Sequence, residues 1–558
     1  MDKAPAQSEH EECARERAEC TRIILESDAE KKLIIAGPGT GKSYLFQQMC
    51  EQFVEDDDRQ ILVLTFINEL VDDLSRDLCG LAEVKTLHSF ALSRIPGDKY
   101  VYMNLGDVIG LDFKLIEGDQ IDYHPIFCKL INREKALEFY SARRRYYNYF
   151  SPHSSVYTLI KIFEQDISRI PEYSFVLVDE YQDFNRLESR LLELLAIKNP
   201  ILLVGDDDQS LYDFKFAEPG QIRSKFSSGD YATFNLPYCS RCTRVIIEAY
   251  ADLIKSAQSR GFLEARAEKP YHYFPNPEKD ALSLAYPHIA VKRSVYEKTV
   301  AYNIDSEIQS LIDPKVNQLP SILVITPLRR QVDDIAKGLR KRGFTNVEAP
   351  QSKAKDSVMD GFRLMLGDAS CNLAWRLLFE SECERLGTRD RLAEVVRESA
   401  RSGEAFKSIL TVDERRKIRK TNATLRKIRD NAEIDEAALD TALKVLRYDK
   451  MEIAQVRLRE ELTERKISKN IFKHIPIKIV TMLGAKGLTR DFTFLVNFDN
   501  RYLLERGADS TLKVTDGSIC RFLVALTRAR KRVSIYTTKS VYPTYVQWLA
   551  SERVEDKT

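Results

Sequence analysis

A glycine-rich segment near the start of the chain combines the residue types that bind phosphate: Ala36-Gly37-Pro38-Gly39-Thr40-Gly41-Lys42-Ser43. Glycines allow backbone N–H groups to turn inward around phosphate oxygens, a lysine ammonium reaches the β- and γ-oxygens, and a serine hydroxyl binds Mg²⁺. An apolar run at 33–35 precedes the segment and a helix-like sequence follows it, which is the order that a P-loop requires. The sequence therefore predicts a nucleoside triphosphate site whose binding residues are Gly37, Gly39, Thr40, Gly41, Lys42 and Ser43.

Three further polar residues follow apolar runs and are suited to phosphoryl hydrolysis. Asp179 and Glu180 come directly after the run at 175–178. The first carboxylate can hold Mg²⁺, as Ser43 can, and the second can orient or deprotonate the attacking water. Gln209 follows the run that ends at Gly205, and its amide can donate to a γ-phosphate while it accepts from the water. We expect all three side chains at one edge of one sheet.

The elements that must position these residues form two stretches in which short apolar strands alternate with amphipathic helices. This pattern predicts an α/β protein with two doubly wound parallel sheets. Expected strands lie at 33–35, 61–66, 175–178 and 201–204 in the first stretch, and at 322–325, 477–480, 494–496 and 533–536 in the second. An aromatic and basic insertion interrupts the first stretch, and an insertion rich in helix-forming residues interrupts the second.

Composition and charge limit the class of protein. A chain of 558 residues with 44% apolar and 30% charged residues is typical of a multidomain globular protein. Residues 1–20 are polar and acidic, so we expect a cytoplasmic protein without a membrane partner. The ten cysteines lie mostly in apolar patterns and are interpreted as reduced, buried thiols. Cys239-Ser-Arg-Cys242 is the single CxxC and lacks a second ligand pair at short spacing, so zinc is not expected there.

The net charge of +1 means that any contact with nucleic acid must be local. Two basic clusters are candidates, one at Arg143, Arg144 and Arg145 beside several aromatic residues, the other between Arg415 and Arg429. Solvated helix faces explain such runs as well as binding does, and both interpretations stay open.

Seven motifs, in order along the chain, resemble those of UvrD/Rep/PcrA-type helicases of the first helicase superfamily. They are the P-loop, Thr65-Phe66-Ile67-Asn68, Thr86-Leu87-His88-Ser89-Phe90, Asp179-Glu180-Tyr181-Gln182-Asp183, the segment from Gly205 to Tyr212, Ala485-Lys486-Gly487-Leu488, and the segment from Val524 to Arg530. The resemblance implies two RecA-like P-loop NTPase domains, each with an inserted mainly helical subdomain, and ATP-driven movement on single-stranded DNA, usually 3′ to 5′, with duplex unwinding.

The resemblance also implies domain boundaries and further catalytic residues. The first motor domain is expected at 1–99 and 166–233 with its insertion at 100–165, and the second at 234–350 and 471–558 with its insertion at 351–470. Lys42, Asp179, Glu180 and Gln209 match catalytic positions that bind ATP and Mg²⁺. Arg528 matches an arginine that reaches the transition state, Arg241 resembles a second one for which Arg244 is a competitor, and Gly487 is assigned to the nucleotide.

Residues assigned to single-stranded or tailed DNA rest on the same resemblance. Family counterparts touch DNA at Thr65, Phe66, Asn68, Thr86, His88 and Phe90. Tyr212 and Phe214 resemble an aromatic pair on which a base stacks, an interaction of about 1–3 kcal/mol per base that tolerates any sequence.

Several family positions differ here, and they leave a second function open. No adenine-reading glutamine stands at the usual distance before the P-loop, and Leu483 replaces a usual histidine. A nucleic-acid-sensing regulatory ATPase that acts with a partner nuclease or effector, for example in antiphage defence, is the alternative to a helicase. A P-loop kinase or GTPase is the third hypothesis, and it leaves Arg528 and Gln209 unexplained.

Overall fold

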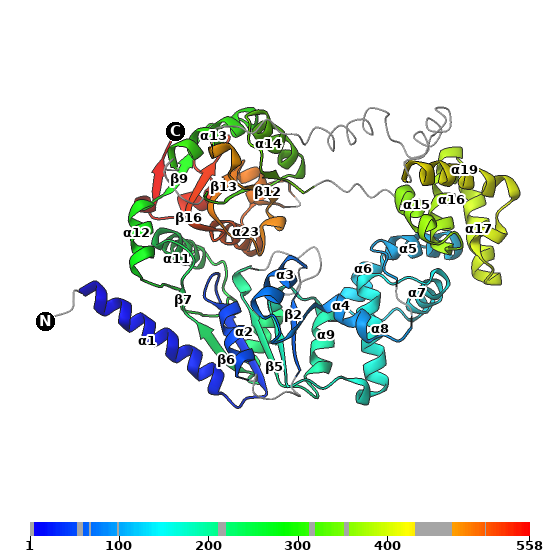
Figure 1. Ribbon diagram of the computed structural model, residues 1–558, viewed down its shortest axis with the longest axis horizontal. Helices are drawn as coiled ribbons and strands as arrows, with labels where there is room; N and C mark the ends of the chain where they lie inside the picture. Colours follow the sequence, from blue (N-terminus) through cyan, green and yellow to red (C-terminus); the bar gives the residue numbers. More distant parts are fainter. Residues whose placement is uncertain are drawn as a thin grey trace. The chain divides into compact units, whose positions relative to one another are not determined.

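The computed structural model describes residues 5–52, 60–65, 68–97, 100–209, 219–311, 319–350, 357–429, 471–507 and 509–558 (Figure 1). The chain divides into two compact units. The sheet unit comprises Met1–Ser93, Leu159–Pro350 and Ser468–Thr558, and the helical unit comprises Arg94–Thr158 and Gln351–Ile467. Phe66, Tyr212 and Phe214 lie outside the described residues, and so does the side chain of Asn68.

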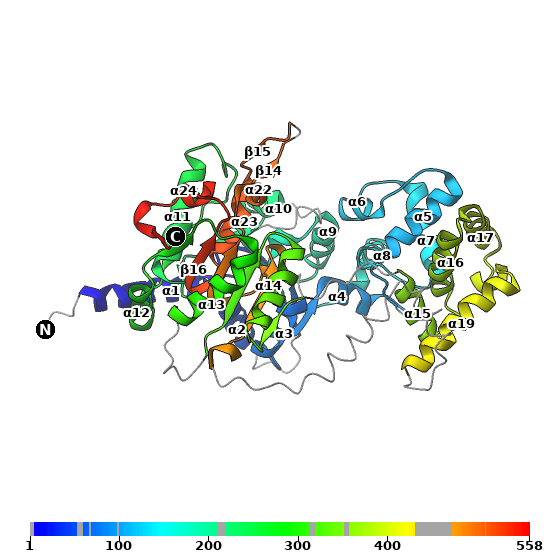
Figure 2. The ribbon, with the colours of Figure 1, turned by 90° about the horizontal axis from the view of Figure 1, so that it is seen from above.

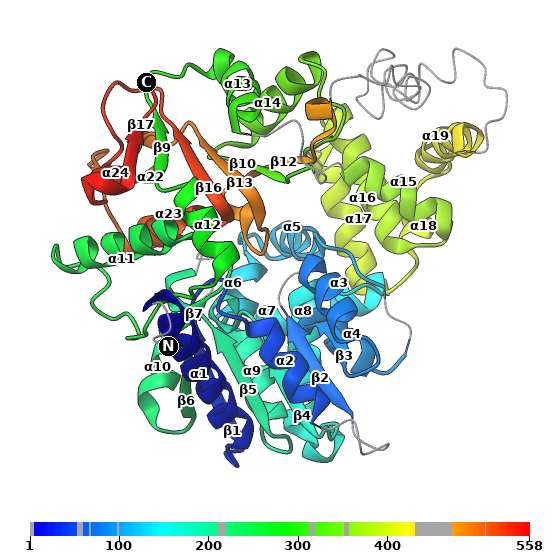
Figure 3. The ribbon, with the colours of Figure 1, turned by 60° about the vertical axis from the view of Figure 1, so that its left-hand side comes forward.

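The first sheet of the sheet unit has six parallel strands in the order β3-β2-β4-β5-β1-β6. Its strands are β1 (Lys31–Ala36), β2 (Ile61–Thr65), β3 (Glu83–Thr86), β4 (Phe175–Val178), β5 (Ile201–Gly205) and β6 (Ala232–Leu236). Helices that accompany it are α1 (Pro5–Glu26), α2 (Lys42–Glu51), α3 (Asn68–Asp77), α4 (Leu87–Arg94), α9 (Arg186–Leu195) and α10 (Pro219–Ser228) (Figure 3). Because helices cover both faces, the central strands are continuous apolar runs rather than alternating ones.

The second sheet has seven parallel strands in the order β11-β12-β10-β13-β16-β9-β17. They are β9 (Ile289–Lys292), β10 (Ile322–Thr326), β11 (Val347–Glu348), β12 (Ile477–Thr481), β13 (Arg490–Val496), β16 (Ala529–Tyr536) and β17 (Val554–Asp556). Its helices are α11 (Arg244–Gln258), α12 (Pro277–Ala285), α13 (Val300–Leu311), α14 (Arg329–Lys341), α22 (Asn500–Leu503), α23 (Asp516–Leu526) and α24 (Thr544–Gln547). Two short ladders, β7 (Tyr238–Cys239) with β8 (His272–Tyr273) and β14 (Glu505–Arg506) with β15 (Leu512–Lys513), complete the unit.

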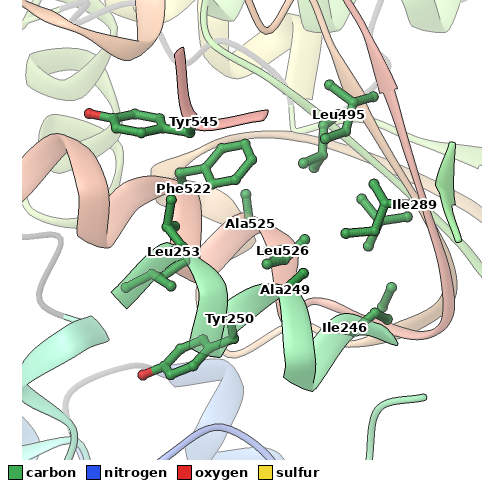
Figure 4. Packing of buried hydrophobic residues seen from close by; sticks show 14 of the residues in the cluster. Ile246, Ala249, Tyr250, Leu253, Ile289, Leu495, Phe522, Ala525, Leu526 and Tyr545 are labelled. Carbon is green, nitrogen blue, oxygen red and sulfur yellow. The ribbon is translucent and has the colours of Figure 1, made fainter. Parts of the chain in front are cut away.

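A large apolar core beside the second sheet joins α11 to α23. Ala249 and Leu253 of α11 lie near Phe522 and Ala525 of α23, and the ring of Tyr250 lies at the edge of this cluster (Figure 4). A reciprocal cap between Thr515 and Ser518 begins α23. The helix ends at Leu526, so its packing fixes the direction in which Arg528 leaves it.

The helical unit consists of short helices from both insertions (Figure 2). They are α5 (Leu105–Glu117), α6 (Tyr123–Cys128), α7 (Glu134–Tyr147), the start of α8 (Pro152–Gln165), α15 (Ser357–Gly367), α16 (Asn372–Leu386), α17 (Arg389–Ser402), α18 (Phe406–Ile409) and α19 (Val412–Arg429). The predicted α/β class with two RecA-like sheets and helical insertions is confirmed. The four domain boundaries stay a prediction.

A buried ionic cluster lies at the centre of the helical unit. The guanidinium of Arg143 donates to Oδ2 of Asp112 at 2.8 Å, and that of Arg376 donates to Oδ1 at 2.9 Å. Arg143 is 3% exposed and the other two are fully buried. Arg143 therefore belongs to the core and is removed from the basic cluster considered for nucleic acid, whereas Arg145 and several arginines and lysines of α19 are exposed.

None of the described helices combines the length and the apolar character needed to cross a lipid bilayer.

Candidate active site

The predicted P-loop joins β1 to α2 in the sheet unit. Gly39 and Gly41 have left-handed φ angles of 75° and 97°, which a residue with a side chain adopts only with strain, and Gly41 is the N-cap of α2. The Thr40 hydroxyl donates to the carbonyl of Gly37 at 2.9 Å and so closes the loop on itself. This loop and the start of α2 form the nest of backbone N–H groups that anions favour.

One of the two carboxylates after β4 pairs with the P-loop lysine. Nζ of Lys42 lies 3.0 Å from Oε1 of Glu180, and Gln182 donates to Oε2 of the same carboxylate at 2.6 Å. Glu180 has φ 54° and ψ 41°, a conformation that is rare for a residue with a side chain and is found where the surroundings impose it. The backbone thus holds this carboxylate at the site against its local preference.

The two neighbouring acids titrate in opposite directions. Burial, together with the charge of Glu180, raises the pKa of Asp179 to about 6. Burial acts in the same sense on Glu180, but the charges of Lys42 and Lys486 outweigh it and lower the pKa of Glu180 to about 2. Such a separated pair is typical of sites in which one carboxylate exchanges protons or metal while the other stays ionised.

Side chains from the second sheet complete the site. Nη2 of Arg528 donates to Oε1 of Gln209 at 2.8 Å, and Nε of Arg528 donates to the carbonyl of Val524 at 3.0 Å. Lys486, which follows β12, bridges Oδ1 of Asp183 and the carbonyl of Gln209, both at 2.5 Å. Gln209, four residues after the first sheet's β5, is therefore held from two sides by cations that come from the second sheet.

Arg241 lies against the P-loop. A Cβ placed on Gly39 would be 2.5 Å from Cβ of Arg241, so only glycine fits beneath this side chain. The competing Arg244 is exposed, lies 4.4 Å from the ring centre of Tyr273 and is 3.7 Å from Asp280. The pKa of Arg528 is lowered to about 10 by burial and by the nearby charge of Arg241. Two guanidinium groups therefore face one region of the site, an arrangement that an anion would stabilise.

The residues present fit a magnesium triphosphate. The glycine cradle supplies backbone donors, Lys42 and two arginines supply positive charge, and Asp179 supplies an anionic oxygen. Ser43 is exposed at the start of α2, and Gly487, with φ 76°, follows Lys486 directly.

Comparison with known proteins agrees with this geometry. Residues 21–215 match a family described as an AAA domain. Segments of the chain are 24% identical to the ATP-dependent DNA helicase PcrA of Staphylococcus aureus, over 44% of this chain and 42% of the relative, and 23% identical to a probable DNA helicase II homolog of Mycoplasma genitalium, over 45% and 37%. A segment covering 17% of the chain is 35% identical to the exonuclease/helicase subunit RexA of Lactococcus lactis, of which it covers 9%.

The chain resembles the UvrD/PcrA-like helicases of superfamily 1. The matched segments span less than half the length of each of these helicase relatives. The resemblance predicted from the motifs is confirmed, and the roles of single residues in this chain stay predictions.

The described residues assigned to DNA differ in exposure. His88 is partly exposed, 3.5 Å from Glu188, and Thr86 caps the start of α4 by accepting from the N–H of Ser89 at 3.2 Å. Thr65 and Phe90 are fully buried. The ring of Phe90 is packed in the core and has no exposed face for a base. The structure therefore does not support direct base contact by Phe90.

Sequence reasoning missed an ionic cluster that supports Gln209. Lys269 lies 2.5, 2.7 and 2.8 Å from carboxylate oxygens of Asp206, Asp207 and Asp208, and all four side chains are buried. Asp206 also accepts from Nε2 of Gln209 at 2.6 Å. The signal in the sequence was the run of three acids after a strand, because three carboxylates can be buried together only if cations pair with them. An ammonium takes the place at which three carboxylates would otherwise attract a metal ion.

A cavity of about 630 Å³ lies beside the P-loop helix. Its lining includes Arg17 of α1, Tyr44 and Gln48 of α2, and Phe274. Aromatic rings, a guanidinium and an amide are suited to a planar heterocycle, and the glutamine here follows the P-loop instead of preceding it.

Proposed function

We propose that this chain is an ATP-dependent DNA helicase and translocase of the UvrD type, which couples ATP hydrolysis to 3′–5′ movement on single-stranded DNA and to duplex unwinding. The observation that carries the proposal is the contact between Arg528 and Gln209, because it joins the P-loop sheet to the second sheet at one catalytic centre. A kinase or GTPase with a single sheet has no use for such a contact.

The residues of the chain divide the chemistry among them. Lys42 and the loop N–H groups hold the β- and γ-phosphates, and Glu180 accepts the proton of the attacking water. Mg²⁺, held by Ser43 and Asp179, would neutralise charge on the phosphates. Gln209 aligns the water, and Arg528 and Arg241 stabilise the charge that develops on the transferred phosphoryl group. Lys42 is paired with Glu180 in the structure, so phosphate binding would draw the ammonium away and release the carboxylate as a base.

Coupling of ATP hydrolysis to movement rests on the fact that the side chains of the site come from two different sheets. Gln209 follows a strand of the first sheet, whereas Lys486 and Arg528, which both donate to it, come from the second. The γ-phosphate that Gln209 and Arg528 would contact is lost on hydrolysis. We assign Thr86 and His88 to the DNA strand, together with Tyr212 and Phe214 after Gln209. Stacking on these aromatics would connect the phosphate sensor to the bases.

The test measures ATP hydrolysis with single-stranded DNA, with single-stranded RNA and with neither. We expect strong stimulation by DNA in the wild type and at least a thousandfold loss for Lys42→Ala, since removal of P-loop charge leaves the phosphates unanchored. Lys31→Ala, at an exposed position in β1, is the matched control and should behave as wild type. Retained turnover in Lys42→Ala would remove the P-loop assignment.

Strand displacement on duplexes with a 3′ or a 5′ tail tests direction and unwinding. Displacement from the 3′-tailed duplex alone supports the proposal. DNA-stimulated hydrolysis without displacement would favour the second function, a DNA-sensing ATPase that acts with a partner nuclease. The name of the Lactococcus relative, which combines an exonuclease with a helicase, motivates that alternative.

A further inference from the structure

A cluster of metal-ligating side chains lies in the helical unit, outside the catalytic centre. Sγ of Cys128 is 3.6 Å from Nδ1 of His124 and 3.8 Å from both ring nitrogens of His153. The two imidazole rings have centroids 4.7 Å apart and are inclined by 49°. One potential ligand atom from each of the three side chains lies within 4.8 Å of the other two.

The two sulfur–nitrogen separations lie close to the edge length of a metal coordination tetrahedron. Zinc bonds of about 2.3 Å to sulfur and about 2.05 Å to nitrogen, set at a tetrahedral angle, place the two ligand atoms about 3.6 Å apart. The measured separations of 3.6 and 3.8 Å differ from this value by at most a few tenths of an ångström. Because Sγ of Cys128 is equally far from both ring nitrogens of His153, that ring must turn to direct one nitrogen at a metal ion.

The backbone holds these side chains in place. His124 and Cys128 are four residues apart on α6 and so share one face of that helix, which Asp122 caps by accepting from the N–H of His124 at 2.9 Å. His153 stands between Ser151 and Ser154, whose hydroxyls accept reciprocally from each other's backbone N–H at 3.2 and 2.9 Å. Preorganisation of this kind is what a metal site requires of its ligands.

We propose that His124, Cys128 and His153 bind a divalent metal ion of borderline softness, with Zn²⁺ as the ion of best fit. One thiolate and two imidazoles suit zinc, whereas Mg²⁺ and Ca²⁺ prefer oxygen ligands. Cys128 is buried and both histidines are partly exposed, so water supplies the fourth ligand from the open side. The bound ion clamps α6 to the start of α8 and closes the loop that carries α7.

A metal ion at this position would stabilise a small segment of the helical unit. The first segment of the helical unit, Arg94–Thr158, is too short to bury a large core of its own. Aromatic pairs such as Phe127–Tyr140 and Phe127–Tyr157, with ring centroids 4.8 and 5.4 Å apart, pack next to the cluster. Metal binding would add stability to that small core through linkage, because only the folded chain brings the ligands together.

Metal content tests the site on the full chain. After loading with Zn²⁺ and desalting, we expect about one zinc per wild-type chain and less than about a tenth of that for Cys128→Ser and for His153→Gln. Cys383→Ser removes a buried thiol elsewhere in the helical unit, and Cys239→Ser breaks the CxxC pair. Both controls should keep the metal. Wild-type protein without zinc, or zinc that disappears with Cys239→Ser but survives Cys128→Ser, would overturn the assignment.

Cobalt substitution gives a readout that needs no variant to fold. Co²⁺-loaded wild-type protein should show intense visible bands typical of tetrahedral cobalt and a near-ultraviolet band from a thiolate ligand. Weak bands of octahedral cobalt without the thiolate band would contradict the proposal.

Chelation should also lower the thermal midpoint of the wild type and leave that of His124→Gln unchanged. An equal chelator effect on both proteins would count against a metal at these ligands.

Discussion

Buried arginines in the two units have opposite kinds of neighbours. In the helical unit, Arg143 and Arg376 both donate to the carboxylate of Asp112. In the sheet unit, Arg528 is equally buried, yet it donates to neutral acceptors: the amide oxygen of Gln209, the carbonyl of Val524 and the hydroxyl of Thr527.

The difference shows in how burial changes each pKa. Burial works against the charge of Arg376, but Asp112 and Glu380 outweigh it and the pKa of Arg376 is raised. Burial and the neighbouring Arg241 lower the pKa of Arg528 instead. A buried cation with its own carboxylate maintains the fold, whereas one that meets only neutral groups is prepared for an anion that arrives from outside.

Arg528→Ala is the strongest test of this difference between the buried arginines of the two units. Under the proposed function, DNA-stimulated ATP hydrolysis should fall about 10³- to 10⁵-fold, because the guanidinium stabilises transition-state charge. The thermal midpoint without nucleotide should stay unchanged or rise, since a destabilised charge is removed. Steady-state kinetics and thermal unfolding check both parts, with exposed Arg530→Ala as control. A large loss of stability would place Arg528 with the structural arginines.

Asp112→Asn tests the other side of the comparison. We expect the free energy of unfolding of the helical unit to fall by about 3–5 kcal/mol, because two buried guanidinium groups lose their only shared counter-charge. Denaturant titration followed by hydrogen exchange in α5, α7 and α16 would locate the loss. Asp119→Asn, an exposed neutralisation just after α5, should leave stability within about 0.5 kcal/mol of wild type. Equal effects of the two would show that the cluster does not hold this unit together.

How far the sequence predicts the molecule depends on the range of the interactions. The P-loop, Asp179, Glu180 and Gln209 were predictable because each lies within a few residues of the end of an apolar run, and continuous apolar runs are typical of covered parallel strands. The role of Arg143 was not predictable, because an arginine beside tyrosines gives the same sequence pattern whether it binds a polyanion or a buried carboxylate. Its cluster also includes Arg376, which lies 264 residues beyond Asp112.

The His124, Cys128 and His153 cluster was missed for a related reason. Cys128 stands in an apolar run, which is typical of a buried thiol, whereas the CxxC pair is the more familiar signal for zinc. The spacing of four residues between His124 and Cys128 is a usable signal on a helix, but His153 becomes their neighbour only through the turns between α6 and α8.

Lys269→Met tests whether the cluster of Lys269 with Asp206, Asp207 and Asp208 is needed for stability, for catalysis or for both. We expect a stability loss of about 3 kcal/mol, at the lower end for a broken buried pair because Arg223 and Arg266 still neutralise Asp207 and Asp208. Turnover should also fall, by about tenfold, because Asp206 positions Gln209. Denaturant titration and the turnover number at saturating ATP check the two effects, with exposed Lys255→Met as control. Lost stability with normal turnover would make this cluster an equivalent of the Asp112 cluster.

The smallest expected effect concerns pH and distinguishes the two catalytic acids. The pKa of Asp179 is raised to about 6, so its proton binds more tightly in the folded chain than in the unfolded one. This group therefore supports folding below about pH 4, and its contribution is lost as the pH rises through about 6. Glu180, with a pKa lowered to about 2, stays ionised across that range.

Protons and Mg²⁺ then compete for Asp179 but not for Glu180. The dissociation constant of Mg²⁺ in the presence of a non-hydrolysable ATP analogue should be constant above about pH 7 and should rise by up to about tenfold per pH unit below about pH 6. Calorimetric titrations between roughly pH 5 and 8 measure this slope. Asp179→Asn should bind Mg²⁺ weakly with no such slope, whereas Glu180→Gln should retain it. A slope that disappears in Glu180→Gln would move the metal to the second carboxylate and exchange the roles of the two acids.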